Sequence, residues 1–157
     1  MNKSFLIAIL IAVLLVGGGI LIIWKLQPSM EEQQSQALSG AFREDSPEFQ
    51  VITKRIIAEN DEDKTWFSPV GTGGIMMSIA GKIRNNSDKT LTGLEIKVSV
   101  LDSFDKVVKD NTLTVVTTQQ KKLEPEGEMN VVVRIDGFKP DDDRARIRWK
   151  VTAIKTE

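Results

Sequence analysis

Hydrophobic positions divide the chain into two parts with different patterns. Residues 5–24, FLIAILIAVLLVGGGILIIW, contain no charged residue and are almost wholly apolar. A helix rises about 1.5 Å per residue, so a helix of this length spans the roughly 30 Å hydrocarbon core of a bilayer. The sequence therefore predicts a short head over residues 1–4 and a transmembrane helix over residues 5–24.

A cleaved secretory signal is the alternative for this segment. Signal peptides have shorter apolar cores and end at a site of small residues, whereas this run ends in Trp24-Lys25-Leu26-Gln27-Pro28. Trp24 also suits the interfacial aromatic belt of a retained helix. Basic residues are nearly balanced, with Lys3 on one flank and Lys25 on the other. We expect a single-pass protein of the inner (cytoplasmic) membrane, with its C-terminal domain in the periplasm or outside the cell.

Small residues within the apolar run suggest a second property of the predicted helix. They are spaced by four or adjacent to one another: Ser4, Ala8, Ala12, Gly17, Gly18 and Gly19. Small residues at such spacing let helix backbones approach closely in lipid. They are also common in spanning helices that have no partner, so packing against another helix and simple membrane insertion both remain open.

A period of two replaces the apolar run from Phe49 onward. Apolar residues alternate with polar ones in segments 75–84, 94–100, 129–135 and 145–153. Segment 49–58 is strand-like but mixed, segment 106–118 is rich in Val and Thr, and turn-forming residues separate the segments. Such alternation is typical of antiparallel strands that cover a core on one face. Six or seven strands predict a mainly β domain over residues 48–157, an antiparallel immunoglobulin-like β-sandwich preceded by a single N-terminal transmembrane helix.

Residues 25–47 form a polar linker between these two parts. Ser29 and Glu32 match a capping box, and apolar residues then recur on one helical face, which predicts a short amphipathic helix over residues 29–42. This helix would lie against the membrane or a partner. A disordered Gln/Ser/Glu tether is the alternative. In both cases Ser46-Pro47 ends the segment.

The absence of two residue types excludes several function classes. The chain has no Cys and no His. Zinc or copper sites built on thiolate or imidazole, and Ser-His or Cys-His nucleophiles, are therefore impossible within it. Lys3 and Lys25 aside, 19 basic and 22 acidic residues remain, which argues against nucleic-acid binding. We expect the protein not to be an enzyme and to bind no cofactor.

Acidic residues cluster in three predicted loops, at 61–63, at Asp102 with Asp105, and at 141–143. If segment 106–118 is one unbroken strand rather than two short ones, the three loops share the end of the domain opposite the linker. Calcium takes about six to eight oxygen ligands, and the weak candidates are Asp61, Asp63, Asp141 and Asp143. A basic partner is a second possibility, and ordinary solvated turns are a third.

Basic residues alternate with apolar ones in the last predicted strand. Arg144, Arg146, Arg148 and Lys150 would line its outer face, and Arg134 would extend this stripe. Such a stripe suits an acidic partner or anionic headgroups. The alternative is a charged strand that discourages edge-to-edge pairing.

A third candidate surface is aromatic. Trp66 and Phe67, in a predicted loop before Pro69, would be either an interface plug or a lid on the core, whereas Trp149 is predicted to be a core residue.

Three segments resemble the FxLYD-type domains of bacterial and archaeal surface proteins. They are Gly81-Lys82-Ile83-Arg84-Asn85-Asn86-Ser87, Val98-Ser99-Val100-Leu101-Asp102 and Leu123-Glu124-Pro125-Glu126-Gly127-Glu128. Val98, Val100 and Leu101 stand where that pattern has Phe, Leu and Tyr, Asp102 is identical, and Glu126 interrupts the Pro-Gly pair. The resemblance covers about residues 75–154. It implies an immunoglobulin-like sandwich, often on an N-terminal anchor, and no catalytic residue.

Together these features favour a non-catalytic accessory or scaffolding subunit of a larger membrane or envelope complex. Its partners would be other subunits of that complex and the bilayer, with no nucleic acid. A free-standing surface module that binds Ca²⁺ or a ligand at the acidic loops is the alternative. A membrane-anchored enzyme would need two carboxylates close together in a cleft.

Overall fold

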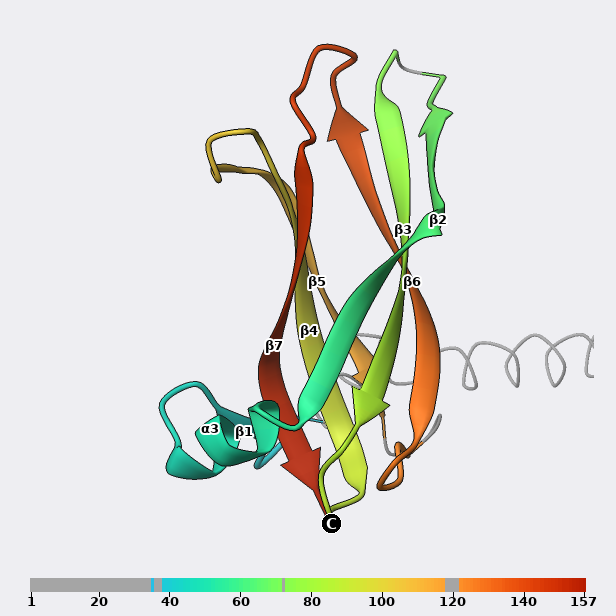
Figure 1. Ribbon diagram of the computed structural model, residues 1–157. Coiled ribbons are helices and arrows are strands. Elements are labelled where there is room, and N and C mark those ends of the chain that lie inside the picture. Colours follow the sequence, from blue (N-terminus) through green and yellow to red (C-terminus); the bar gives the residue numbers. More distant parts are fainter. Residues whose placement is uncertain (1–34, 36–37, 72, 118–121) are drawn as a thin grey trace, which may run out of the picture. The chain divides into compact units, whose positions relative to one another are not determined.

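The computed structural model describes residues 35, 38–71, 73–117 and 122–157 (Figure 1). Contacts divide the chain into two units, Met1–Ser35 and Gln36–Glu157, and the second unit contains the β-sheets. The predicted transmembrane helix with its small residues, and most of the predicted linker helix, lie outside the described residues. Within the described ranges, no helix is both long and apolar enough to cross a bilayer.

Two antiparallel sheets make up the second unit. One has the strand order β1-β7-β4-β5 and the other has the order β2-β3-β6 (Figure 1). The bounds are β1 Phe42–Arg43, β2 Ile56–Pro69, β3 Ile75–Asn85, β4 Leu91–Leu101, β5 Val107–Val116, β6 Glu128–Phe138 and β7 Arg146–Thr156, with helix α3 at Pro47–Thr53. The expectation of a mainly β, antiparallel domain is confirmed.

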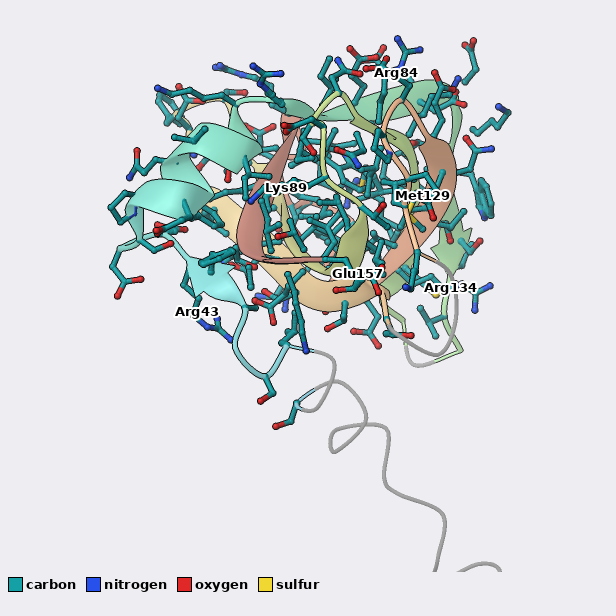
Figure 2. The ribbon with its side chains drawn as sticks, turned by 90° about the horizontal axis from the view of Figure 1, so that it is seen from below. Arg43, Arg84, Lys89, Met129, Arg134 and Glu157 are labelled. Carbon is teal, nitrogen blue, oxygen red and sulfur yellow. The ribbon has the colours of Figure 1, made fainter. Side chains whose placement is uncertain are left out.

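The core lies between the two sheets, where the predicted inward faces meet. In β4, Leu94, Ile96, Val98 and Val100 are all 0% exposed. Residues of β3 and β6 cover them from the other sheet: Met77, Ile79, Ile83, Val131, Val133 and Ile135. Figure 2, seen along the strands, shows side chains filling the space that the ribbons enclose. Alternation was a sound guide here because every second side chain of these strands enters the space between the sheets.

The strand predicted over residues 49–58 is wrong in its first half, where the chain forms α3. Ser46 caps this helix, since its side chain accepts a hydrogen bond from the backbone N–H of Phe49 at 3.2 Å, and Pro47 occupies the first turn. Phe49 and Ile52 are spaced by three and are both buried. The Ser-Pro pair therefore begins a helix rather than merely ending the linker.

The linker prediction also needs correction at its C-terminal end. The residues from Leu38 to Gly40 form a turn, and Phe42 belongs to β1, so no helix continues to residue 42. β1 pairs with β7, with Phe42 opposite Ile154 and Arg43 opposite Ala153. The sandwich thus includes residues that the sequence pattern assigned to the linker.

Candidate functional site

Three connections lie together at one end of the sandwich, at the top of Figure 1. They join β2 to β3, β4 to β5 and β6 to β7. The segment predicted as either one strand or two is a single strand, β5, so the β4–β5 hairpin and the β6–β7 connection reach the same end. These two connections contain the acidic residues at 102–105 and 141–143.

The β4–β5 hairpin is organised by Asp102. Its Oδ1 accepts hydrogen bonds from the backbone N–H groups of Phe104 and Lys106, both at 2.9 Å. Its own N–H donates to the carbonyl of Lys106 at 2.9 Å. Asp105 closes the turn at φ 64, a conformation that Asp tolerates better than most residues. The Phe104 side chain projects from this turn and is 86% exposed.

Asp143 braces the hairpin from the neighbouring connection. Its Oδ2 accepts a hydrogen bond from the backbone N–H of Ser103 at 2.8 Å, and the N–H of Ala145 donates to the carbonyl of Leu101 at 2.9 Å. The hydrogen bond from Ser103 lowers the pKa of the Asp143 carboxyl from its ordinary value of 3.8. Asp142 supports its own loop by accepting a hydrogen bond from the N–H of Lys139 at 2.8 Å. These carboxylates therefore hold loops in shape.

The third acidic cluster is not in a loop. Asp61 and Asp63 lie within β2, at an irregularity between the pairs Asp61–Ala80 and Trp66–Ser78. Thr65 spans this bulge, because its hydroxyl donates to the carbonyl of Asp61 at 2.9 Å and accepts from the N–H of Ala80 at 3.3 Å. The prediction that three acidic loops share one end is wrong, since only two of them do.

Asp61 has a partner within its own strand. Oδ2 of Asp61 lies 2.8 Å from Nζ of Lys64, and this hydrogen bond lowers the pKa of Asp61 and raises that of Lys64. Across the described ranges, no three Asp or Glu residues are grouped so that they could hold a metal ion. The calcium candidates Asp61, Asp63, Asp141 and Asp143 are spread over a bulged strand and a separate connection.

Trp66 and Phe67 belong to β2 rather than to a loop. Trp66 opposes Ser78 and Phe67 opposes Met77, so the two aromatic rings lie on opposite faces of the sheet. They are 48% and 52% exposed, which shows that neither is a buried lid on the core. The guanidinium of Arg144 lies over Phe67, 5.3 Å from the ring centroid, and partly covers it. Their role in an interface stays a prediction.

The predicted basic stripe is shorter than the sequence suggested. Arg146, Arg148 and Lys150 are exposed residues of β7, as the alternation predicts, and these three residues are named the β7 stripe. Arg144 precedes the strand and contacts Phe67 and Phe138 instead. Arg134 belongs to β6 of the other sheet, as Figure 2 shows, so it does not extend the stripe.

Two members of the β7 stripe have acidic partners. Nη1 of Arg146 lies 3.1 Å from Oδ1 of Asp105, and Nζ of Lys150 lies 2.6 Å from Oε1 of Glu44. No sequence pattern pointed to Glu44, because it follows a two-residue strand that has no periodic signal.

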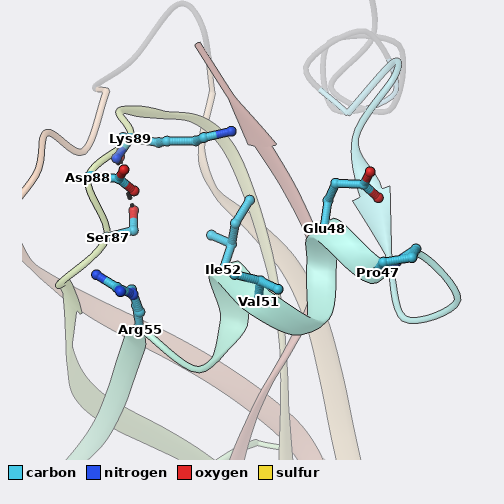
Figure 3. Close-up of a pocket in the computed structure, with 8 residues that line it drawn as sticks. All are labelled: Pro47, Glu48, Val51, Ile52, Arg55, Ser87, Asp88 and Lys89. Carbon is cyan, nitrogen blue, oxygen red and sulfur yellow. Dashed lines mark hydrogen bonds between the residues drawn. The ribbon is translucent and has the colours of Figure 1, made fainter.

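A groove of about 450 Å³ separates α3 from the β3–β4 turn (Figure 3). It is lined by Pro47, Glu48, Val51, Ile52, Arg55, Ser87, Asp88 and Lys89. Val51 is 66% exposed at its edge. The sequence pattern gave no sign of this groove, because it predicted a strand over the residues that form α3. The capping pair Ser46-Pro47 was the signal that could have identified it.

Comparison with known proteins assigns no family. No family model matches the chain, and no curated protein matches it. Among solved structures, the chain is similar to the Northeast Structural Genomics Consortium target SoR45, with 11% identity over 68% of this chain and 86% of that one, at a TM-score of 0.42. The putative ApaA protein of Bordetella pertussis is 10% identical over 65% of this chain and 86% of that one, at a TM-score of 0.33. Likenesses at this level carry no conclusion about function.

Proposed function

We propose that this chain is a non-catalytic, single-pass membrane protein that serves as an accessory or scaffolding subunit of a larger membrane or envelope complex. The observation that carries the proposal is the high exposure of the Phe104 side chain on a hydrogen-bonded turn. A benzyl side chain that is 86% exposed contributes little to the core of its own domain. It sits on a turn held by hydrogen bonds from two loops, through Asp102 and Asp143.

A rigid turn changes what an exposed aromatic residue can do. Binding costs free energy when side chains and loops must be ordered, so a preorganised turn binds with a smaller entropic loss. Aromatic residues are also enriched among the residues that dominate protein–protein interfaces. Phe104 on its braced hairpin therefore has the features of an anchor that enters a pocket on another protein.

The remaining parts of the proposal rest on the sequence and on the strand order. The apolar run at residues 5–24 supports insertion in the inner membrane, with the sandwich in the periplasm or outside the cell. A three-stranded sheet packed against a four-stranded one supports an immunoglobulin-like architecture. This agrees with the resemblance to FxLYD-type domains over about residues 75–154.

The test compares full-length proteins extracted from their native membrane with a mild detergent and sized under native conditions. We expect the wild type to migrate with a larger complex in fixed stoichiometry. Phe104→Ala should migrate near its own mass, whereas Val51→Ala, which also removes an exposed apolar side chain, should migrate like the wild type. Wild-type migration near monomer or dimer mass would refute the subunit role. Co-migration of Phe104→Ala would refute the role of the hairpin.

A further inference from the structure

β7 has one free edge along most of its length. On one side it pairs with β4 from Arg146 to Thr156. On the other side β1 pairs only with Ala153 and Ile154. No strand in the described part of the chain pairs with this second side from Arg146 to Thr152. Backbone N–H and C=O groups along such an edge are a template for another strand.

The core side of this edge is incompletely covered. Ile147 and Trp149 pack against the core but are only half-buried, unlike Val151 further along the strand. Phe67, whose partner across the sheet is the buried Met77, is 52% exposed on the core side of β2. Apolar side chains of an added strand would therefore gain contact with Ile147 and Trp149.

The outer side of the edge is positively charged. Arg146, Arg148 and Lys150 alternate with those apolar residues, and Lys97 of β4 lies opposite Lys150. The chain itself places an acidic residue here, since Glu44 pairs with Lys150 just after β1 leaves β7. Among the described residues, no ion pair within 4.0 Å involves Arg148, so this guanidinium is available to a partner.

The same charges argue against a second copy of this chain as the occupant. Two β7 edges joined to each other would place like charges side by side, and such cross-strand pairs are destabilising. An acidic strand would instead form opposite-charge pairs with the β7 stripe. Long basic side chains on an edge thus oppose self-association while they favour one class of partner.

We propose that the free edge of β7 binds an extended segment of another protein, in which acidic and apolar residues alternate. The segment adds a strand to the four-stranded sheet, with its apolar side chains on Ile147 and Trp149. One acidic side chain pairs with Arg148, and its acidic neighbours share or displace the ion pairs that Arg146 makes with Asp105 and Lys150 makes with Glu44. This surface adjoins the Phe104 hairpin through the ion pair between Arg146 and Asp105, but the inference does not depend on that hairpin.

The probe is a short synthetic peptide in which glutamate and valine alternate, added to the full-length protein in detergent micelles. A Trp24→Phe, Trp66→Phe background leaves Trp149 as the only tryptophan, so its fluorescence reports binding at the edge. A peptide N-methylated at alternate residues keeps its charge but loses the strand hydrogen bonds. Arg148→Glu tests the stripe, and Arg134→Glu, an exposed arginine on the other sheet, is the matched control.

We expect saturable binding that weakens with salt, about tenfold weaker binding to Arg148→Glu, and a change below about twofold for Arg134→Glu. The N-methylated peptide should not bind. Absence of wild-type binding, equal binding of the N-methylated peptide, or equal losses in both variants would each overturn the proposal. A concentration-dependent dimer abolished by Arg148→Glu would also overturn it, because a second copy would then occupy the edge.

Discussion

The indole ring of Trp149 packs directly against the backbone of Gly81, joining the two sheets across the core. A Cβ atom at position 81 would lie 2.4 Å from Cζ2 of Trp149 and 2.8 Å from the carbonyl oxygen of Glu59. Both distances are far shorter than a van der Waals contact, and the second neighbour is backbone. Position 81 therefore accepts only glycine without displacement of the ring.

Gly81→Ala is expected to destabilise the domain by about 1–3 kcal/mol, the usual cost of forcing extra volume into a packed core. Denaturant unfolding of the full-length protein in micelles, followed by tryptophan fluorescence, measures this effect. Gly71→Ala is the control, because its Cβ would meet nothing within 4 Å. Equal stability of the two variants would mean that Trp149 does not pack on Gly81.

Asn85 ties the β3–β4 turn to the segment that precedes β6. Its Nδ2 donates to the carbonyls of Lys89, Leu123 and Glu124 at 2.8, 3.0 and 3.1 Å. Its Oδ1 accepts from the backbone N–H and the hydroxyl of Ser87 at 3.0 and 2.6 Å. The side chain is fully buried, so water cannot replace it as the hydrogen-bond partner of these groups.

Asn85→Ala is expected to lower the free energy of unfolding by roughly 3 kcal/mol, because several buried groups would be left without hydrogen-bond partners. Thermal unfolding monitored by circular dichroism tests this value. Asn86→Ala, at the next and less buried position, should change stability by no more than about 1 kcal/mol. If both substitutions had the same small effect, the proposed network would not hold the turns together.

Stability should fall in acid partly through Asp143. The hydrogen bond from Ser103 lowers the pKa of Asp143 in the folded state. Asp143 therefore contributes its full stabilisation at pH values above the pKa of the unfolded chain, near 3.8. That contribution is lost as the pH drops through the lower folded pKa. Asp61 and Glu128 act in the same direction, the latter through hydrogen bonds from Lys82 and Arg84.

Melting curves between pH 7 and pH 2 test this linkage. Asp143→Asn should show a smaller loss of stability on acidification than the wild type, since the titrating group is gone. Asp141→Asn, at a neighbouring position that does not bond to Ser103, should follow the wild-type profile. A steeper acid loss in Asp143→Asn would contradict the sign derived from the lowered pKa.

Calcium should have little effect on the folded state. Asp102, Asp142 and Asp143 already accept backbone hydrogen bonds within their loops, which leaves these carboxylates less available to a cation. A ligand stabilises a protein only when it binds the folded state, so millimolar Ca²⁺ should leave the melting temperature of the full-length protein unchanged. A rise in the melting temperature that EDTA reverses would restore the calcium alternative.

The sequence pattern located strands best where each residue has one clear environment. β4 follows the alternation from Leu94 to Val100, because every second side chain enters the core. The pattern failed near Val51 and Ile57, where apolar residues are both exposed and buried within a few positions. The hydrophobic period was ambiguous there, and only the capping residue Ser46 indicated a helix.

The β7 stripe could be predicted from the sequence because it depends only on local periodicity. Arg146, Arg148 and Lys150 share a face because a strand has a period of two, whatever it packs against. Trp66 was assigned to a loop because Pro69 and a Gly-rich run follow it and an acidic run precedes it. The structure instead continues β2 through that run, and the hydroxyl of Thr65 fills the place of a missing backbone contact.

By itself the sequence determined the antiparallel strands, the basic residues of β7 and the exclusion of histidine and cysteine chemistry, because these follow from residue type and local period. Tertiary structure alone decided which loops meet, that Asp143 braces the Phe104 hairpin, and that β1 leaves most of the β7 edge free. Those relationships join residues distant in the chain. They depend on how the sheets pack, which no local pattern encodes.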